Sequence, residues 1–420
     1  MTWSGVLAQV QVDGWAQLLG RLIRQFRRPD LAEDALAEAF AQAAQQWPDA
    51  GVPANPQGWL ATVAQRRLLD ALRRESRFRA PQFHALVAAS EPAPRPQPQP
   101  GEQADERLPL LFMATHPALA PEVRPALALR FVLGVPTEGI ARLFLVPGPT
   151  MTARLTRAKR RLAATGVAFE VPDFTVWPHR VNDVARSIYL AFTAGYVPGA
   201  DSEARMADAG DAVRLAVLAA DLLPQQPTFT ALAALTRLHH ARRDARFDPD
   251  GSLVLLADQN RSRWRADEIA EGLDRLTALQ PTTGYPEELR LQALIAAFHA
   301  TALAADQTDW PAIALAYRRL ERLTGSPIVR LNRAVAVGEA QGPDAGLRVL
   351  RAAAEQLPGH HRVDVVRAEL LVRDGRIDAA RAAFDSALAT APPGPERRHI
   401  AARLAALEQT SSASSPPAAG

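Results

Sequence analysis

The chain has 420 residues, 48% of them hydrophobic, no cysteine and a net charge of +3. This length accommodates two or three domains, and the lack of cysteine excludes disulfide bonds, thiolate metal sites and cysteine nucleophiles. No stretch approaches the roughly 20 apolar residues that span a bilayer, and the N-terminus lacks the pattern of a signal peptide. We therefore expect a cytoplasmic protein. Because alanine and leucine dominate over β-branched runs, we expect an all-α fold.

The charge is unevenly distributed along the chain. Residues 1–170 carry 20 basic and 15 acidic groups, whereas residues 171–420 carry 28 and 30, so the two parts have net charges of +5 and −2. Any nucleic-acid affinity should therefore reside in the first part. Only one of the 48 basic residues, Lys159, is a lysine.

Residues 6–79 are predicted to form a first small helical domain. One of its helices contains the sequence DLAEDALAEAF, with apolar residues on one face and acids on the other. The acids are Asp30, Glu33, Asp34 and Glu38. Such a face is either a docking surface or a solvated helix surface, and the sequence of this helix alone leaves both open.

A later helix of the same domain follows Asn55-Pro56. Its apolar face includes Trp59 and Leu60, and it also carries several arginines. The aromatic, amide and cationic side chains on it and in the preceding loop include Trp47, Asn55, Trp59, Arg66, Arg73 and Arg74. Both tryptophans could also lie in the hydrophobic core.

Residues 80–107 are predicted to be a flexible linker, because their centre, EPAPRPQPQPGEQADE, is rich in proline and poor in apolar residues. A linker of this length would allow the flanking domains to stay apart.

Residues 108–170 are predicted to form a second helical domain that ends in a helix-turn-helix. The turn contains Leu145–Pro149, and the last helix begins at Thr150, with an apolar face of Met151, Leu155, Ala158 and Leu162. The expected exposed face has five basic groups, three hydroxyls and no acid, which suits the major groove of DNA. It consists of Thr150, Thr152, Arg154, Thr156, Arg157, Lys159, Arg160 and Arg161. The alternative is an ordinary basic amphipathic helix.

Residues 178–408 are again predicted to be helical, with a 34-residue repeat, and the tail 409–420 to be disordered. Small, large, small and proline residues recur at this period, which is typical of tetratricopeptide (TPR) hairpins. The pairs are Ala334 and Ala368, Gly346 and Ala380, Leu350 and Phe384, Ala353 and Ala387, and Pro358 and Pro392.

No catalytic or metal-binding constellation is found, so we expect neither an enzyme nor a cofactor. The adjacent pairs His239-His240 and His360-His361 point in different directions on a helix and cannot share one metal. Asp248–Gly251 hints at a calcium loop, but the first and twelfth positions would then be Arg246 and Ala257, where carboxylates are needed. We expect a tight turn there.

Taken together, these residues resemble the sigma-70 type initiation factors of bacterial RNA polymerase, and in particular the small extracytoplasmic-function class. The acidic helix Ala32–Phe40 is similar to the pattern A-E-D-x-x-Q-E-x-F, and Trp59–Arg74 to W-L-x-x-x-A-x-x-x-x-x-D-x-x-R-R. The helix-turn-helix follows in the family's order. Further short motifs resemble a subgroup with a TPR-like C-terminal extension: His116-Pro117, LFLVP at 143–147, IYLAFTAGY at 188–196, LLADQNRSRW at 255–264 and LNRAVAV at 331–337.

The resemblance implies a promoter-specificity factor that binds core RNA polymerase and promoter DNA, with an extension that regulates it. The acidic helix would dock on the polymerase, and the last helix of residues 108–170 would read the −35 element. The Trp59–Arg74 helix and the loop before it would open the −10 element. The groups that could stack on or hold the unpaired strand there are Trp47, Asn55, Trp59, Arg66, Arg73 and Arg74. Thr150, Thr152 and Arg154 would reach base edges, and Arg157, Lys159, Arg160 and Arg161 would hold phosphates.

Two other functions compete with this interpretation. A helical-repeat adaptor could use its N-terminal part as a repressor or activator that binds DNA without polymerase. An all-helical enzyme is the third reading, and only a bound metal or cofactor would favour it. The protein or peptide that the extension binds, and whether the extension inhibits or is required, cannot be read from the sequence.

Overall fold

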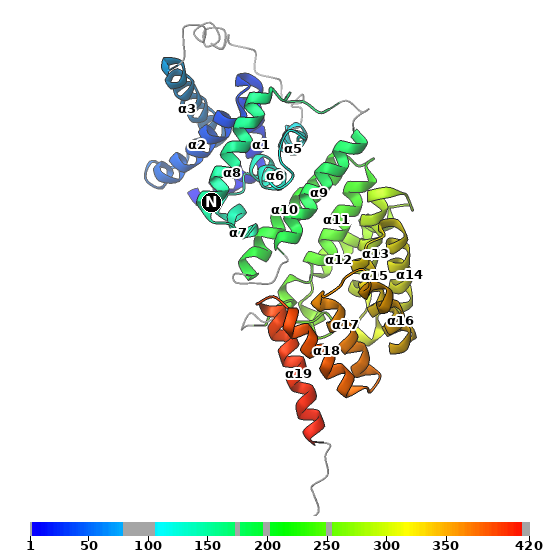
Figure 1. Cartoon of the computed structure of the whole chain (residues 1–420). Coiled ribbons are helices and arrows are strands. Elements are labelled where there is room, and N and C mark those ends of the chain that lie inside the picture. The colour runs from blue at the N-terminus through cyan, green and yellow to red at the C-terminus, as the bar shows by residue number, and fades with distance from the viewer. Residues whose placement is uncertain (1, 79–105, 173–176, 196–201, 249–253, 414–420) are drawn as a thin grey trace, which may run out of the picture. The chain divides into compact units, whose positions relative to one another are not determined.

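The computed structural model describes residues 2–78, 106–172, 177–195, 202–248 and 254–413. Within these ranges the helix is the only extended regular structure, which confirms the all-α prediction. The helices form two compact units, Met1–Gly195 with Ala207–Leu222 and Tyr196–Met206 with Leu223–Gly420 (Figure 1). Nearly all of the predicted linker and most of the predicted turn Asp248–Gly251 lie outside the described residues.

The first unit begins with three long helices, α1 (Trp3–Phe26), α2 (Pro29–Ala50) and α3 (Pro56–Phe78). Arg28, just before α2, ties the start of α2 to the end of α3, because its guanidinium bonds both Asp30 and Glu75 at 2.7 Å. The apolar faces predicted for α2 and α3 meet in a core with α1. Its fully buried members include Leu19, Leu36, Leu60 and Leu68.

Four shorter helices follow: α5 (Arg107–Ala114), α6 (Arg124–Leu133), α7 (Thr137–Leu143) and α8 (Gly148–Thr165). They pack against the first three helices rather than standing apart from them, since α1 contacts α5 and α6, and α2 contacts α8. The chain turns after α6 at Gly134, whose φ is 67°. A Cβ at this position would lie 2.7 Å from Cδ2 of Trp15, so only glycine allows α1 to approach this closely.

The first unit also includes α9 (Trp177–Gly195) and most of α10 (Ser202–Leu222), and therefore extends beyond the boundary expected near residues 172–178. Helix α9 packs on α5, α6 and α7. Trp177 lies 6.1 Å from Phe112 between ring centroids, and the buried Arg180 donates a hydrogen bond to the carbonyl oxygen of Phe112.

The second unit is a succession of helices, most of them joined by short connections, with a longer one of residues 241–265 between α11 and α12. They are α11 (Pro227–His240), α12 (Ala266–Thr277), α13 (Gly284–Thr301), α14 (Trp310–Thr324), α15 (Pro327–Gln341), α16 (Pro343–Ala354), α17 (His361–Arg373), α18 (Ile377–Thr390) and α19 (Pro395–Ala413). Short 3₁₀ turns lie at Arg243–Ala245, Arg261–Arg263 and Ala305–Gln307. Residues 409–413 of the predicted disordered tail instead belong to α19, and the rest of that tail lies outside the described residues.

The 34-residue period corresponds to two consecutive helical hairpins, α15–α16 and α17–α18. The small and large repeat positions of the two helix pairs are all buried: Ala334, Gly346, Leu350 and Ala353 in the first hairpin, and Ala368, Ala380, Phe384 and Ala387 in the second. Gly346 lies where α15 and α16 cross, since a Cβ there would meet the backbone of Ala334 at 2.8 Å. The repeated positions are therefore the small and large residues at which the two helices of each hairpin pack closely.

Candidate nucleic-acid interface

A four-residue turn, Phe144–Pro147, joins α7 to α8. Leu145 adopts a left-handed conformation with φ of 53°, which is uncommon for a residue other than glycine. Its N–H donates to the carbonyl oxygen of Arg142 at 3.2 Å, and the N–H of Val146 donates to that of Ala141 at 3.0 Å. These two bonds satisfy the last carbonyl groups of α7 and fix the direction in which α8 starts.

Helix α8 separates an apolar face from a basic one. It begins at Gly148, two residues before the predicted start, with Pro149 in its first turn, where the missing N–H removes no intrahelical bond. The predicted apolar face is confirmed, since Met151, Leu155, Ala158 and Leu162 are all buried. The exposed side chains are Thr150, Thr152, Arg154, Arg157, Arg160 and Arg161, whereas Thr156 is half-buried.

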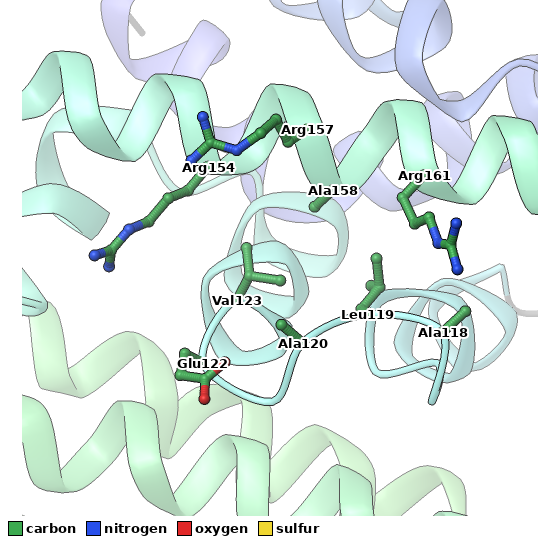
Figure 2. A pocket seen from close by; sticks show the side chains of 9 residues that line it. All are labelled: Ala118, Leu119, Ala120, Glu122, Val123, Arg154, Arg157, Ala158 and Arg161. Atoms are coloured by element: carbon green, nitrogen blue, oxygen red, sulfur yellow. The ribbon is translucent and has the colours of Figure 1, made fainter.

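A cleft of about 450 Å³ lies beside this basic face, between α8 and the segment before α6. Figure 2 shows Leu119 and Val123 pointing from that segment toward α8, with the side chains of Arg154 and Arg161 on either side of them. Its remaining lining residues are Ala118, Ala120, Glu122, Arg157 and Ala158. The cleft thus combines an apolar floor with positively charged edges.

Lys159 is the exception on α8, and the prediction that it belongs to the exposed face is wrong for this structure. Its side chain is only 7% exposed. The ammonium Nζ lies 2.6 Å from Oε2 of Glu33 and also bonds Asp34, both on α2. The single lysine of the chain is therefore engaged within the protein and does not face solvent.

Glu33 is the centre of this contact and is likewise buried, with a side chain that is 4% exposed. While Oε2 accepts from Lys159, Oε1 accepts from Nε of Arg130 at 2.6 Å. Burial on its own would raise the pKa of Glu33, but the positive charges of Arg130 and Lys159 outweigh it and hold that pKa below its ordinary value. Glu33 is therefore a buried carboxylate paired with two cations.

The other acids of α2 remain closer to the surface. Asp30 is half-buried and paired with Arg28, whereas Asp34 and Glu38 are exposed. The carboxylate of Glu38 lies 3.7 Å from Nε of Arg67 on α3. The structure thus divides the predicted acidic face, because Glu33 points into a buried contact while its neighbours face solvent.

The two tryptophans expected near a separated DNA strand lie side by side with ring centroids 5.6 Å apart, edge to face. Trp47 belongs to α2 rather than to a loop and is 2% exposed, so the expectation that its ring is open to a base is wrong for this structure. Its partner Trp59 on α3 is half-buried. The buried Trp47 thus packs against the inner side of the Trp59 ring.

The polar residues predicted with them lie at the surface of α3 and before it. Asn55 begins α3, because its Oδ1 accepts from the N–H of Gly58 at 2.9 Å. Arg66, Arg73 and Arg74 are exposed, and Arg73 lies 3.4 Å from Asp70. These three cations are therefore exposed along one helix. A surface that binds a run of phosphates needs cations arranged in this way.

Arg130, which contacts Glu33, was not among the candidate residues. It is the one charge within the apolar run PALALRFVL of α6, and its side chain is 13% exposed. A single charge inside an apolar run indicates a buried ion pair. The sequence thus contained a signal for this residue, although not for the identity of its partner.

In the described part of the chain, no group of three or more His, Asp or Glu side chains is arranged to hold a metal ion. His240 instead bonds Glu268 through Nδ1 at 3.2 Å, and His361 lies 3.3 Å from Glu396. The helices of the described ranges also include none that is long and apolar enough to cross a membrane.

Comparison with known protein families finds two matching regions in this chain. Residues 13–78, from within α1 to the end of α3, match the model of Sigma-70 region 2. Residues 180–280 match a family described only as of unknown function, DUF6596. That second match runs from α9 in the first unit to the end of α12 in the second.

A relative extends the likeness to nearly the whole chain. The chain is 40% identical over 410 residues to "Uncharacterized protein R00370" of Rhizobium meliloti (strain 1021), covering 96% of each protein. It therefore belongs to one family with that protein.

Proposed function

We propose that this protein is a promoter-specificity factor of the extracytoplasmic-function class, with a TPR-like C-terminal extension that regulates it. The observation that carries the proposal is the Sigma-70 region 2 at residues 13–78, followed in the same unit by a helix-turn-helix, α7–α8, with a basic exposed face. Region 2 belongs to a non-enzymatic family whose partners are core RNA polymerase and promoter DNA. Such a protein acts in the cytoplasm.

The proposed −10 surface lies on α3 and its N-terminus. Arg66, Arg73 and Arg74 would hold the backbone of the separated strand, and the half-buried ring of Trp59 would stack on an unpaired base. Trp47 supports this ring through their edge-to-face contact. Asn55 fixes the start of α3 and so positions Trp59.

The proposed −35 surface is the exposed face of α8. Thr150, Thr152 and Arg154 lie in its first two turns, from which recognition helices reach base edges. Arg157, Arg160 and Arg161 lie further along and would bind phosphates. Lys159 could join them only after leaving Glu33.

The proposed polymerase-docking surface is the acidic face of α2. Asp34 and Glu38 are exposed and would complement a basic surface on the polymerase, which guides orientation and association rate. Asp30 lies at the edge of this face, and Glu33 belongs to it only when its buried contact is open.

Run-off transcription with purified core polymerase on the promoter of its own locus tests the proposal. We expect initiation that requires both components. DNA binding by the chain alone, with no transcript in any form, would instead support the repressor or activator interpretation. The discriminating measurement is promoter binding with and without core polymerase.

The regulatory role of the extension requires a carefully placed deletion. A chain ending at Val171 loses α9, whose Trp177 and Arg180 contact Phe112 on α5. The failure of such a chain could therefore reflect misfolding of the first unit. A chain ending at Leu222 keeps α9 and α10 intact. We expect this second chain to differ from the full-length protein in transcription, and equal activity and equal regulation in cells would contradict the regulatory role.

A further inference from the structure

One buried contact joins two surfaces that the proposed function requires to be free. Glu33 lies on the acidic face assigned to polymerase, and Lys159 lies on the helix assigned to promoter DNA. Their side chains are 4% and 7% exposed, with 2.6 Å between Oε2 and Nζ. Glu33 and Lys159 therefore bury each other's charged group in this contact.

The contact is a network rather than one ion pair. Arg130 binds the second carboxylate oxygen of Glu33, and Asp34 accepts a further bond from Lys159. Two cations from α6 and α8 therefore enclose Glu33, while Asp34 binds Lys159 from the exposed edge of the contact. A buried charge that loses its partner is strongly unfavourable, so these groups separate only when another surface supplies replacement charges or water reaches them.

We propose that this network, Glu33 with Arg130, Lys159 and Asp34, is an autoinhibitory latch that holds α2 on α8 and must open before the chain can dock on core polymerase. The inference rests on the proposed function, because it assumes that α2 faces polymerase and α8 faces DNA. Opening releases Glu33 and Asp34 for a basic docking surface and Lys159 for a phosphate. Only the open molecules of the free chain can bind polymerase or DNA. The apparent affinity for each partner is therefore lower than that of the open form, in proportion to the open fraction.

A double label reports the opening directly. The chain has no cysteine, so Gln45→Cys on α2 and Ala164→Cys on α8 place two spin labels at exposed positions that are not among the proposed contact residues. We expect one short distance distribution in the free full-length chain and a longer one with core polymerase. Binding of polymerase without a change in distance would overturn the latch.

The single lysine gives a second readout in the free chain. Acylation of the amine of Lys159, followed by mass spectrometry of its peptide, should be slow in the parent and about tenfold faster in Glu33→Gln, which removes one charge of the network. Asp49→Asn, an exposed acid at the end of α2, is the matched control and should react like the parent.

The two readouts separate failure of the latch from failure of the proposed function. If Glu33→Gln changes neither the reactivity nor the distance, the latch is wrong whatever the chain binds. If the variant opens but no form of the chain binds polymerase, the proposed function fails and the contact is only structural. Circular dichroism checks the fold, and Lys159→Met opens the same network from α8 if Glu33→Gln does not fold.

Discussion

Trp15 donates its indole N–H to the carbonyl oxygen of Arg130 at 3.1 Å, from a position 115 residues earlier in the chain. The same N–H lies 3.2 Å from the carbonyl oxygen of Phe131, and the guanidinium of Arg130 lies 5.1 Å from the centre of the Trp15 ring. One side chain of α1 therefore holds the end of α6 and also supports the arginine that binds Glu33. This contact therefore connects α1, one of the helices matched to Sigma-70 region 2, with α6, one of the helices that follow it. We call it the Trp15–Arg130 joint.

Trp15→Phe should weaken the first unit, because it keeps an aromatic ring but removes the N–H that the carbonyl oxygens of Arg130 and Phe131 accept, and only that of Arg130 keeps a second donor, the N–H of Gly134. We expect a loss of about 1–3 kcal/mol in the free energy of unfolding, measured by urea denaturation. Trp3→Phe is the matched control, since Trp3 is 36% exposed and should change stability by less than about 0.5 kcal/mol. Equal effects of the two substitutions would contradict the importance of this joint.

Arg154→Ala and Arg160→Ala should have different effects on promoter binding. Arg154 lies early in α8, where an arginine paired with guanine contributes about 1–3 kcal/mol of discrimination between bases. We therefore expect Arg154→Ala to reduce selectivity among −35 variants, and Arg160→Ala to weaken all promoters similarly. Holoenzyme binding to a set of −35 substitutions measures both, and a uniform loss in both variants would show that α8 does not read bases through Arg154.

Gly346→Ala should destabilise the second unit although alanine favours helices. Its Cβ would lie 2.8 Å from the carbonyl oxygen of Ala334 and 2.9 Å from Cα of Gly338, so α15 and α16 would have to move apart. Overpacking of this kind costs about 1–3 kcal/mol, measured by thermal or urea unfolding. Gly148→Ala is the control, because a Cβ there meets nothing within 4 Å, and a similar loss in both variants would contradict the close crossing.

Mild acid should destabilise the second unit through His299. Burial, together with the positive charges of Arg242 and Arg261, lowers the pKa of His299 from 6.5 to about 4. Because the unfolded chain takes up a proton below pH 6.5 and the folded chain does not until about pH 4, stability is complete above this window and is lost as the pH falls through it. The loss at pH 5 is about 2 kcal/mol.

Thermal unfolding at pH 7 and pH 5 measures this loss. His299→Asn removes the titrating ring and should show a smaller fall in melting temperature between the two pH values. A variant that keeps the full pH dependence of the parent would assign the effect to other groups, such as the buried His239, whose pKa burial also lowers well below its ordinary value.

The local patterns of the sequence predicted the faces of single helices well. Met151, Leu155 and Leu162 are buried and Arg154 is exposed, because a 3.6-residue period fixes which side chains share a face. The hairpin positions of the 34-residue repeat are buried for the same reason. The match of residues 13–78 to Sigma-70 region 2 supports the family resemblance in its coarser form.

Contacts between distant segments could not be predicted in this way. Lys159 lies at the border of the apolar face of α8, and nothing near it indicates that Glu33, 126 residues earlier, occupies the same space. The sequence places Trp47 in the loop before Trp59, yet α2 continues through Pro48 to Ala50. In both cases packing between segments decides the burial of the side chain, and a periodic pattern contains no information about the partner.

The place of α9 in the first unit sets an order of events during synthesis. Phe112 and its neighbours on α5 leave the ribosome before Trp177 and Arg180, the side chains that cover them. Chains grow at about 5–20 residues per second, so this part of the core stays uncovered for several seconds while the intervening segment is made. The nascent protein completes its N-terminal unit only after the helix that begins the DUF6596 match has emerged, and a ribosome that stalls before Gly195 therefore holds an incomplete N-terminal unit.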